Sequence, residues 1–141
     1  KGCPLRVVID TNIFISGLLN LEGGAAKIIN HFKDDIFELV ITRDVFEEYL
    51  RAIHFFNNNI PSERSEELLE FVFEKAVKIK AANPHGLCKD TDDEKFLTAA
   101  FSGHAEYLVT KNKKDFPRDA SGLRVVNVRE FLGKIEKRRG L

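Results

Sequence analysis

The chain has 141 residues, and its 22 basic side chains balance its 22 acidic ones. This length suits one domain, and the balanced charge excludes a protein whose whole surface is strongly basic. The apolar runs are too short to cross a membrane, and the N-terminus lacks a signal-peptide pattern. Cys3 and Cys88 have no zinc-site spacing, so we expect thiols in a reducing compartment. We expect a single domain over residues 1–141 in a cytoplasmic protein.

Buried strands alternate with amphipathic helices along the chain. Short β-branched or apolar runs predict strands at residues 7–9, 39–42, 107–110 and 124–128. Helical spacing of apolar residues predicts helices at 12–19, 25–33, 43–53, 62–82, 92–102 and 129–137. The buried stripe predicted for the long helix is Leu68, Leu69, Val72, Phe73 and Ala76. This alternation predicts an α/β fold, a three-layer sandwich around a central, mostly parallel, twisted sheet with Rossmann-type winding.

A carboxylate stands at the end of the first predicted strand. Asp10, Thr11 and Asn12 follow this strand and lead into an apolar run. Such residues commonly begin helices, so one interpretation makes Asp10 only a helix cap. In open parallel sheets, however, ligands bind at the carboxyl ends of the strands. Asp10 is therefore a functional candidate if later segments bring further carboxylates to the same edge.

The helix after the second predicted strand carries two adjacent glutamates. Glu47 and Glu48 both lie at the margins of its apolar face, so the spacing alone does not choose between them. Arg51 follows Glu47 by four residues, which favours a surface ion pair and an ordinary structural role for Glu47. Glu48 has Ala52 at that spacing. We favour Glu48 as the functional residue, with a solvated glutamate as the alternative.

A run of acids opens the fifth predicted helix. Thr91 and Glu94 form a capping-box pattern, which predicts a helix that begins at Asp92. Acids in a first turn complement the helix dipole, and this accounts for Asp92 and Glu94. Asp93, in contrast, shares a helix face with three apolar residues, Phe96, Leu97 and Ala100. An inward carboxylate needs a partner, and a metal ion is one, so Asp93 is also a candidate.

The segment after the strand at 107–110 completes the set. Asn112 and Asp115 offer oxygen atoms, and Lys111 belongs to a dense lysine cluster, although a solvated turn is the ordinary explanation for each lysine. Together the four segments predict one acidic pocket at the sheet edge. Oxygen ligands without His or Cys favour Mg²⁺ or Mn²⁺ over zinc.

These motifs resemble those of PIN-domain ribonucleases, among them the toxin components of prokaryotic VapC-type toxin–antitoxin pairs. The resemblance lies in four segments in the same order, residues 7–12, 42–48, 88–97 and 108–112. It implies a doubly wound PIN-like fold and metal-dependent cleavage of single-stranded RNA. The acidic quartet of the family falls on Asp10, Glu48 and Asp93, and the fourth position falls on Asn112, where many members have Asp. Asp115 is the alternative fourth ligand; Asp90 matches a recurrent Asp whose role stays open.

On these grounds we expect hydrolysis of a phosphodiester by metal-activated water. The expected catalytic residues are Asp10, Glu48, Asp93 and Asp115, with Asn112 as a further metal ligand. The expected substrate contacts are Thr11, Asn12, Thr110 and Lys111. The resemblance also implies a homodimer and an antitoxin protein as partner. Phe55 and Phe56, in an expected loop, support an apolar contact surface, although packing beneath the long helix explains them equally well.

Two other classes of protein stay open. A phospho-acceptor signalling domain also gathers acids at strand ends, but its acceptor Asp typically follows a middle strand, where this chain has Thr42. A catalytically weak PIN-like binding module is the second, because Asn112 lacks the negative charge of an Asp ligand.

Overall fold

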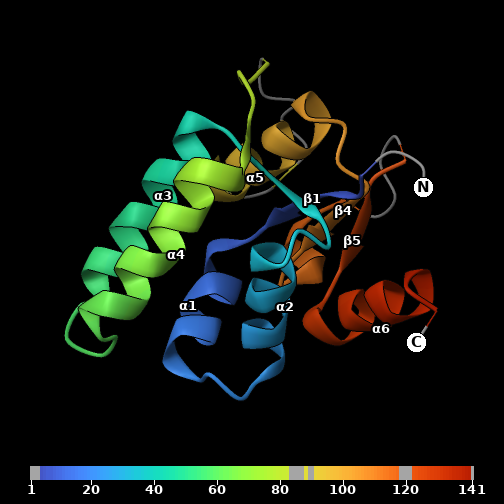
Figure 1. Cartoon of the computed structure of the whole chain (residues 1–141). Coiled ribbons are helices and arrows are strands. Elements are labelled where there is room, and N and C mark those ends of the chain that lie inside the picture. Colours follow the sequence, from blue (N-terminus) through green and yellow to red (C-terminus); the bar gives the residue numbers. More distant parts are fainter. Residues whose placement is uncertain (1–3, 83–87, 89–90, 118–121, 141) are drawn as a thin grey trace.

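The computed structural model describes residues 4–82, 88, 91–117 and 122–140. Parallel strands form a central sheet in the order β3-β2-β1-β4-β5. The strands are β1 (Arg6–Ile9), β2 (Glu38–Ile41), β3 (Val77–Lys78), β4 (Tyr107–Val109) and β5 (Arg124–Val126). The helices are α1 (Thr11–Leu19), α2 (Gly24–Lys33), α3 (Arg43–Phe55), α4 (Ser62–Lys75), α5 (Thr91–Ser102), the short 3-10 helix η1 (Lys113–Asp115) and α6 (Val128–Arg138). They surround the sheet (Figure 1), which confirms the predicted α/β sandwich.

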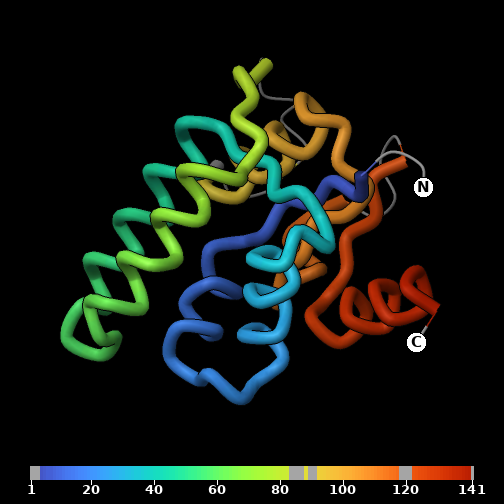
Figure 2. The backbone as a smooth tube through the Cα atoms, viewed as in Figure 1, coloured from blue at the N-terminus to red at the C-terminus, as the bar shows by residue number. Residues whose placement is uncertain are grey.

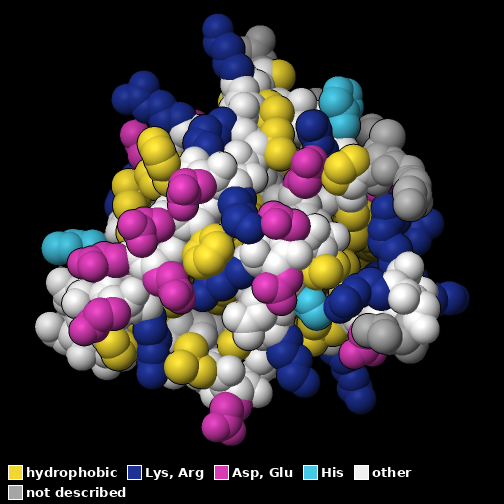
Figure 3. Space-filling model, viewed as in Figure 1, with side chains coloured by type: hydrophobic (Ala, Val, Ile, Leu, Met, Phe, Trp, Pro, Cys, Tyr) yellow, Lys and Arg dark blue, Asp and Glu magenta, His cyan; other side chains and the backbone are white. Residues whose placement is uncertain are grey.

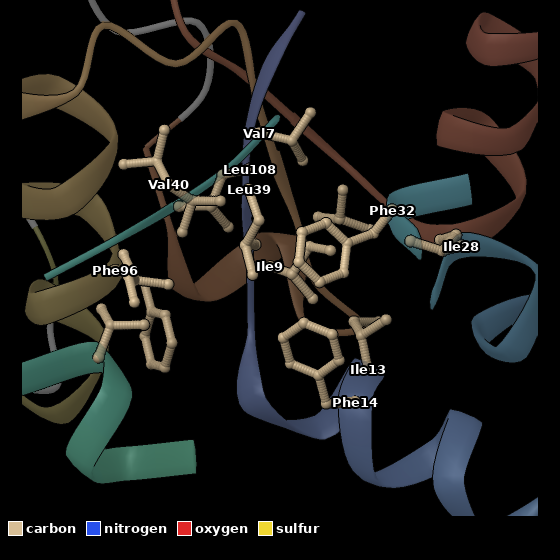
Figure 4. Close-up of a cluster of buried hydrophobic side chains, with 14 of the residues drawn as sticks. Val7, Ile9, Ile13, Phe14, Ile28, Phe32, Leu39, Val40, Phe96 and Leu108 are labelled. Atoms are coloured by element: carbon tan, nitrogen blue, oxygen red, sulfur yellow. The ribbon is translucent and has the colours of Figure 1, made fainter. Parts of the chain in front are cut away.

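β1 runs through the middle of the sheet and supplies the centre of the core. Residues 7–9 are fully buried, because helices cover β1 on both sides. In Figure 4, Phe96 lies to one side of β1 and Phe32 to the other. α5 packs against β1, β2 and β4, while α2 contacts α1 and α6.

The pairing of β1 with β4 creates the edge on which the candidate site lies. Ile9 pairs with Val109, and the Asp10 backbone N–H donates to the Val109 carbonyl at 2.9 Å. Figure 2 shows that β1 passes directly into α1 at this edge. The residues that follow the two strands, Asp10 and Thr110, are therefore neighbours although the chain separates them widely.

The helix predicted over residues 62–82 is wrong in its last part. α4 ends at Lys75, Ala76 is extended, and the chain then adds the edge strand β3 beside β2. Residues 77–80 read Val-Lys-Ile-Lys, an alternation of apolar and polar side chains that is typical of a strand. This alternation outweighs the helical spacing that precedes it.

The outer surface of α3 and α4 is more apolar than predicted. Phe73, expected in the buried stripe, is 69% exposed, because α4 packs through Leu68 and Val72 instead. Phe55 lies at the end of α3, not in a loop, and is 79% exposed. Phe56 is half-buried and packs against the core. These two helices therefore present aromatic surface that the described part of the chain leaves uncovered.

Several predicted boundaries shift by one or two residues, and two of the shifts come from helix caps. Thr42 does not continue β2; its hydroxyl accepts the Val45 backbone N–H at 3.2 Å and caps α3. Asn127 does not continue β5; with Glu130 it forms a capping box that starts α6. α5 begins at Thr91, one residue before the predicted start. Cap residues end a strand when their side chains satisfy the first N–H groups of a helix.

No helix in the described residues is long and apolar enough to cross a membrane. Cys88 is a free thiol, while Cys3 lies outside the described residues, as does Asp90.

Candidate active site

Asp10 stands at the N-cap position of α1, but its side chain does not cap the helix. The carboxylate is buried, at 7% exposure, and Oδ2 accepts a hydrogen bond from Thr110 Oγ1 at 2.7 Å. The interpretation of Asp10 as only a helix cap is therefore wrong. Its side chain is directed to the end of β4 instead.

Burial raises the pKa of Asp10 above the ordinary aspartate value. The hydrogen bond from Thr110 and a backbone hydrogen bond with Thr11 oppose this shift, and the charges of Glu48 and Asp115 add to it. The charges of Glu48 on α3 and Asp115 in η1 thus both act on Asp10, which follows β1 at the carboxyl edge of the sheet.

Glu48 is held by two cations. Its Oε1 accepts from Arg51 Nη2 at 2.8 Å and from Lys95 Nζ at 3.2 Å. Burial acts to raise the pKa of Glu48, but these two hydrogen bonds outweigh it and the net shift is downward. The pKa of Glu48 therefore lies below the ordinary glutamate value.

The predicted ion pair between Glu47 and Arg51 is wrong. Arg51 pairs with Glu48, three residues before it, and Glu47 pairs with Arg43 at 3.3 Å. Both spacings place side chains on one helix face, so the sequence spacing did not decide the partner. The interaction that distinguishes Glu48 is its electrostatic effect on Asp10.

Asp93 and Asp115 both act electrostatically on Cys88. Burial raises the pKa of the Cys88 thiol to about 12, and the charges of Glu94, Asp93 and Asp115 contribute to the shift. Asp93 is half-buried in the first turn of α5. Glu94 is more buried, at 7% exposure, and accepts the Cys88 backbone N–H at 3.0 Å. Glu94 therefore anchors the chain before α5 as well as complementing the helix dipole.

Thr110 organises the turn after β4. It is fully buried, and while its hydroxyl donates to Asp10 it accepts the Asn112 backbone N–H at 3.1 Å. The Asn112 side chain is exposed, and Asp115 is half-buried. Of the two candidate fourth ligands, Asp115 is the one whose charge acts on Asp10.

The four predicted substrate contacts divide by exposure. Asn12 and Lys111 are exposed, and Lys111 Nζ contacts Ser16 Oγ on α1. Thr11 and Thr110 are buried. The Thr11 hydroxyl has no hydrogen-bond partner within the described residues and lies beside a small apolar cavity between α1, α3 and α4.

Sequence reasoning missed two residues that contact this site. Tyr49, predicted only as an apolar helix residue, donates its hydroxyl to the Ile9 carbonyl at 2.5 Å. Burial and the charge of Asp10 raise the Tyr49 pKa well above its ordinary value, so the phenol stays protonated. Lys95, which contacts Glu48, was given no role from the sequence. Its place directly after three acids was the one indication in the sequence.

The donor set suits a hard divalent cation. Within residues 4–82, 88, 91–117 and 122–140, no three Asp, Glu, His or Cys side chains converge closely enough to hold an ion by themselves. Mg²⁺ commonly binds through one or two carboxylates and keeps several waters. A buried Asp10 whose strongest charged neighbours are two other carboxylates fits such an ion, because a cation relieves their repulsion.

The chain belongs to the PIN domain family, because residues 6–114 match the sequence profile of that domain. PIN domains are generally nucleases, and PIN nucleases generally use divalent metals. The uncharacterized protein MJ1680 of Methanocaldococcus jannaschii is 30% identical over 150 residues, which cover 94% of this chain and 93% of that protein.

Two solved structures share the fold. PAE2754 from Pyrobaculum aerophilum superposes with a TM-score of 0.63 at 12% identity, over 94% of this chain and 90% of that one. The structure of VapBC2 from Rickettsia felis, bound to a DNA fragment from their promoter, matches with a TM-score of 0.56 at 16% identity. That match covers 87% of this chain and 98% of the other. At these identities the likeness establishes the fold alone.

Proposed function

We propose that residues 1–141 form a single PIN-like domain that hydrolyses phosphodiester bonds of single-stranded RNA with Mg²⁺ or Mn²⁺. The observation that carries the proposal is the buried Asp10, whose pKa is raised by burial and by the neighbouring charges of Glu48 and Asp115. Membership of the PIN family and the oxygen-only donor set support the same reaction.

Each acidic residue has a defined part in this reaction. Asp10, Glu48, Asp93 and Asp115 bind the metal, and Asn112 orients water or substrate. The ion, when bound, lowers the pKa of a water molecule and offsets charge on the phosphate. Thr110 fixes the direction of the Asp10 carboxylate through its hydrogen bond.

The exposed polar groups beside the acids bind the RNA backbone. Lys111 follows β4 and Asn12 lies in the first turn of α1, so both border the edge that holds Asp10. An RNA phosphate bound between Lys111 and Asn12 places the adjacent phosphodiester bond next to the carboxylates. The buried hydroxyls of Thr11 and Thr110 act indirectly, by shaping this edge.

We further propose that the protein is the toxin of a toxin–antitoxin pair in the cytoplasm. Five glutamates lie along α4: Glu63, Glu66, Glu67, Glu70 and Glu74. Figure 3 shows acidic side chains gathered over this helix with apolar ones between them. A hollow of about 480 Å³ there is lined by Phe46, Leu69, Glu70, Phe73 and Glu74. Such a surface repels RNA and suits a basic, partly apolar antitoxin segment.

We also propose that the protein is a homodimer. The Phe55 ring at the end of α3 packs edge-on against Phe56 and is 79% exposed, so it offers an apolar surface to a second copy of the chain. Light scattering at several concentrations tests this, with Phe55→Ser beside the parent. A parent that stays monomeric throughout contradicts the dimer.

The reaction is tested with labelled single-stranded RNA, duplex RNA and single-stranded DNA, each incubated with Mn²⁺, with Mg²⁺ and with EDTA. We expect cleavage of the single-stranded RNA only when a divalent ion is present. Cleavage that persists in EDTA contradicts the metal dependence. RNA binding with metal but without turnover identifies a binding module instead.

A further inference from the structure

Lys95 brings a positive charge into the acidic site from α5. Its side chain is only 16% exposed, and its ammonium lies 3.2 Å from Glu48 Oε1 on α3. A charge covered from water is unfavourable unless it is paired, and Glu48 is the carboxylate that pairs with Lys95. The family resemblance and the predicted site gave Lys95 no part in the reaction.

Charge is unevenly distributed across the site. At one end, a single oxygen of Glu48 accepts from both Arg51 and Lys95, so the protein neutralises this carboxylate itself. At the other end, the strongest charged neighbours of Asp10 are acids, Glu48 and Asp115. Among the described residues, Asp10 therefore has acidic charged neighbours where Glu48 has cationic ones.

We propose that the Lys95 ammonium supplies one of the positive charges of the catalytic site, so that one divalent ion at the Asp10 end completes it. This inference rests on the proposed nuclease function and adds the number of ions and the role of Lys95. Two-metal nucleases place two cations about 4 Å apart to stabilise both sides of the displacement. Here the Lys95 ammonium, bound to Glu48, takes the place of the second cation.

A purely structural role for Lys95 leads to a different expectation. If Lys95 only joins α5 to α3, its removal lowers the melting temperature and leaves the number of bound ions unchanged. Arg51 provides the matched control, because it binds the same Glu48 oxygen at 2.8 Å while its side chain is 61% exposed. Solvent screens the exposed Arg51 charge, so Arg51→Gln removes a hydrogen bond to this oxygen without removing a charge that is covered from water.

The test counts Mn²⁺ ions bound per chain from the electron paramagnetic resonance signal of the free ion during a titration. The samples are the parent, Lys95→Gln, Lys95→Met, Lys95→Arg and Arg51→Gln, each checked for folding by thermal unfolding. We expect one ion in the parent, Lys95→Arg and Arg51→Gln. We expect two ions in the neutral Lys95 variants, because without the Lys95 charge Glu48 can bind a second cation besides the one that it binds together with Asp10. A parent that binds two ions, or neutral Lys95 variants that still bind one, overturns the proposal.

Cleavage of single-stranded RNA by the same samples separates this inference from the proposed function. A parent that binds two ions and cleaves RNA refutes the role of Lys95 and leaves the nuclease function standing. A parent that binds one ion without cleaving RNA refutes the nuclease function, and the ion count in the Lys95 variants still decides the charge argument.

Discussion

Asp10 Oδ2 accepts a hydrogen bond of 2.7 Å from Thr110 Oγ1, across 100 residues of sequence. The bond joins the ends of the adjacent strands β1 and β4, and Thr110 is fully buried beneath it. Because the same hydroxyl accepts the Asn112 N–H, the direction of Asp10 and the course of the turn toward Asp115 depend on one side chain.

Thr110→Val keeps the shape of the side chain and removes its hydroxyl. The pKa of Asp10 should rise further, because the hydrogen bond from Thr110 lowers it. The Asn112 N–H loses its acceptor, which should cost about 1–3 kcal/mol of stability. Removing a residue that orients a metal ligand typically reduces metal affinity or activity about 10–100-fold. Mn²⁺ calorimetry and the rate of RNA cleavage measure both effects.

Thr98→Val is the control for this substitution. Thr98 is also buried, but its hydroxyl has no hydrogen-bond partner within the described residues. The same change of side chain should therefore leave metal affinity unaltered and stability equal or slightly higher. If Thr98→Val lowers Mn²⁺ affinity as much as Thr110→Val does, the effect comes from general disturbance of the fold.

Asp10→Asn should stabilise the metal-free protein. The pKa of Asp10 is raised in the folded state, so its ionised form costs stability; the cost is absent below the ordinary value of 3.8 and complete above the raised pKa. At pH 7 we expect a gain on the order of 1 kcal/mol, or roughly 3 °C in melting temperature. The difference between variant and parent should vanish at acid pH. A variant less stable than the parent at pH 7 in EDTA contradicts the raised pKa.

Glu48→Gln and Glu47→Gln are matched changes at neighbouring positions. Glu48 acts on Asp10 and is bound by Lys95, whereas Glu47 pairs with Arg43, whose side chain is 90% exposed. We expect Glu48→Gln to lower cleavage at least 10-fold and Glu47→Gln to stay within 2-fold of the parent, as rough limits. Equal losses in the two variants contradict the assignment of Glu48. Single-turnover cleavage rates provide the comparison.

Asp115→Asn and Asn112→Ala distinguish the two candidate fourth ligands. The charge of Asp115 acts on Asp10, while the Asn112 side chain is exposed. Ligand charge strongly affects affinity for hard cations, so Asp115→Asn should weaken Mn²⁺ binding about 10-fold and Asn112→Ala much less. Asn112→Asp adds a charge at the family position and should tighten binding if that position is a ligand. Calorimetric titration that ranks Asn112→Ala as the more damaging change reverses the assignment.

Most of the fold follows from periodicity, and its exceptions have local causes. The buried runs of β1, β2 and β4 and the helical spacing of α2 and α3 predicted those elements within a few residues. The strand β3 was missed because its short alternation follows directly on the helical pattern of α4, while its pairing with β2 is a long-range contact. Phe73 was misplaced because adjacent residues of a helix point in different directions, and Val72, not Phe73, faces the core.

The candidate site was predictable in its residue types and less so in its contacts. Strand ends pointed to Asp10 and Thr110, because parallel strands bring such positions to one edge. The partner of Arg51 and the contact between Lys95 and Glu48 depend on how α3 packs against α5. Sequence spacing describes the faces of one helix at a time, so it could not predict contacts between two helices.

The most direct test of a metal-dependent nuclease centred on Asp10 is the single-turnover cleavage rate of labelled single-stranded RNA at saturating Mn²⁺, for the parent and for Asp10→Asn. We expect a loss larger than the roughly 10–100-fold typical of residues that only orient a ligand, from a variant that melts no lower than the parent in EDTA. Asp10→Asn that cleaves RNA at the rate of the parent contradicts the account.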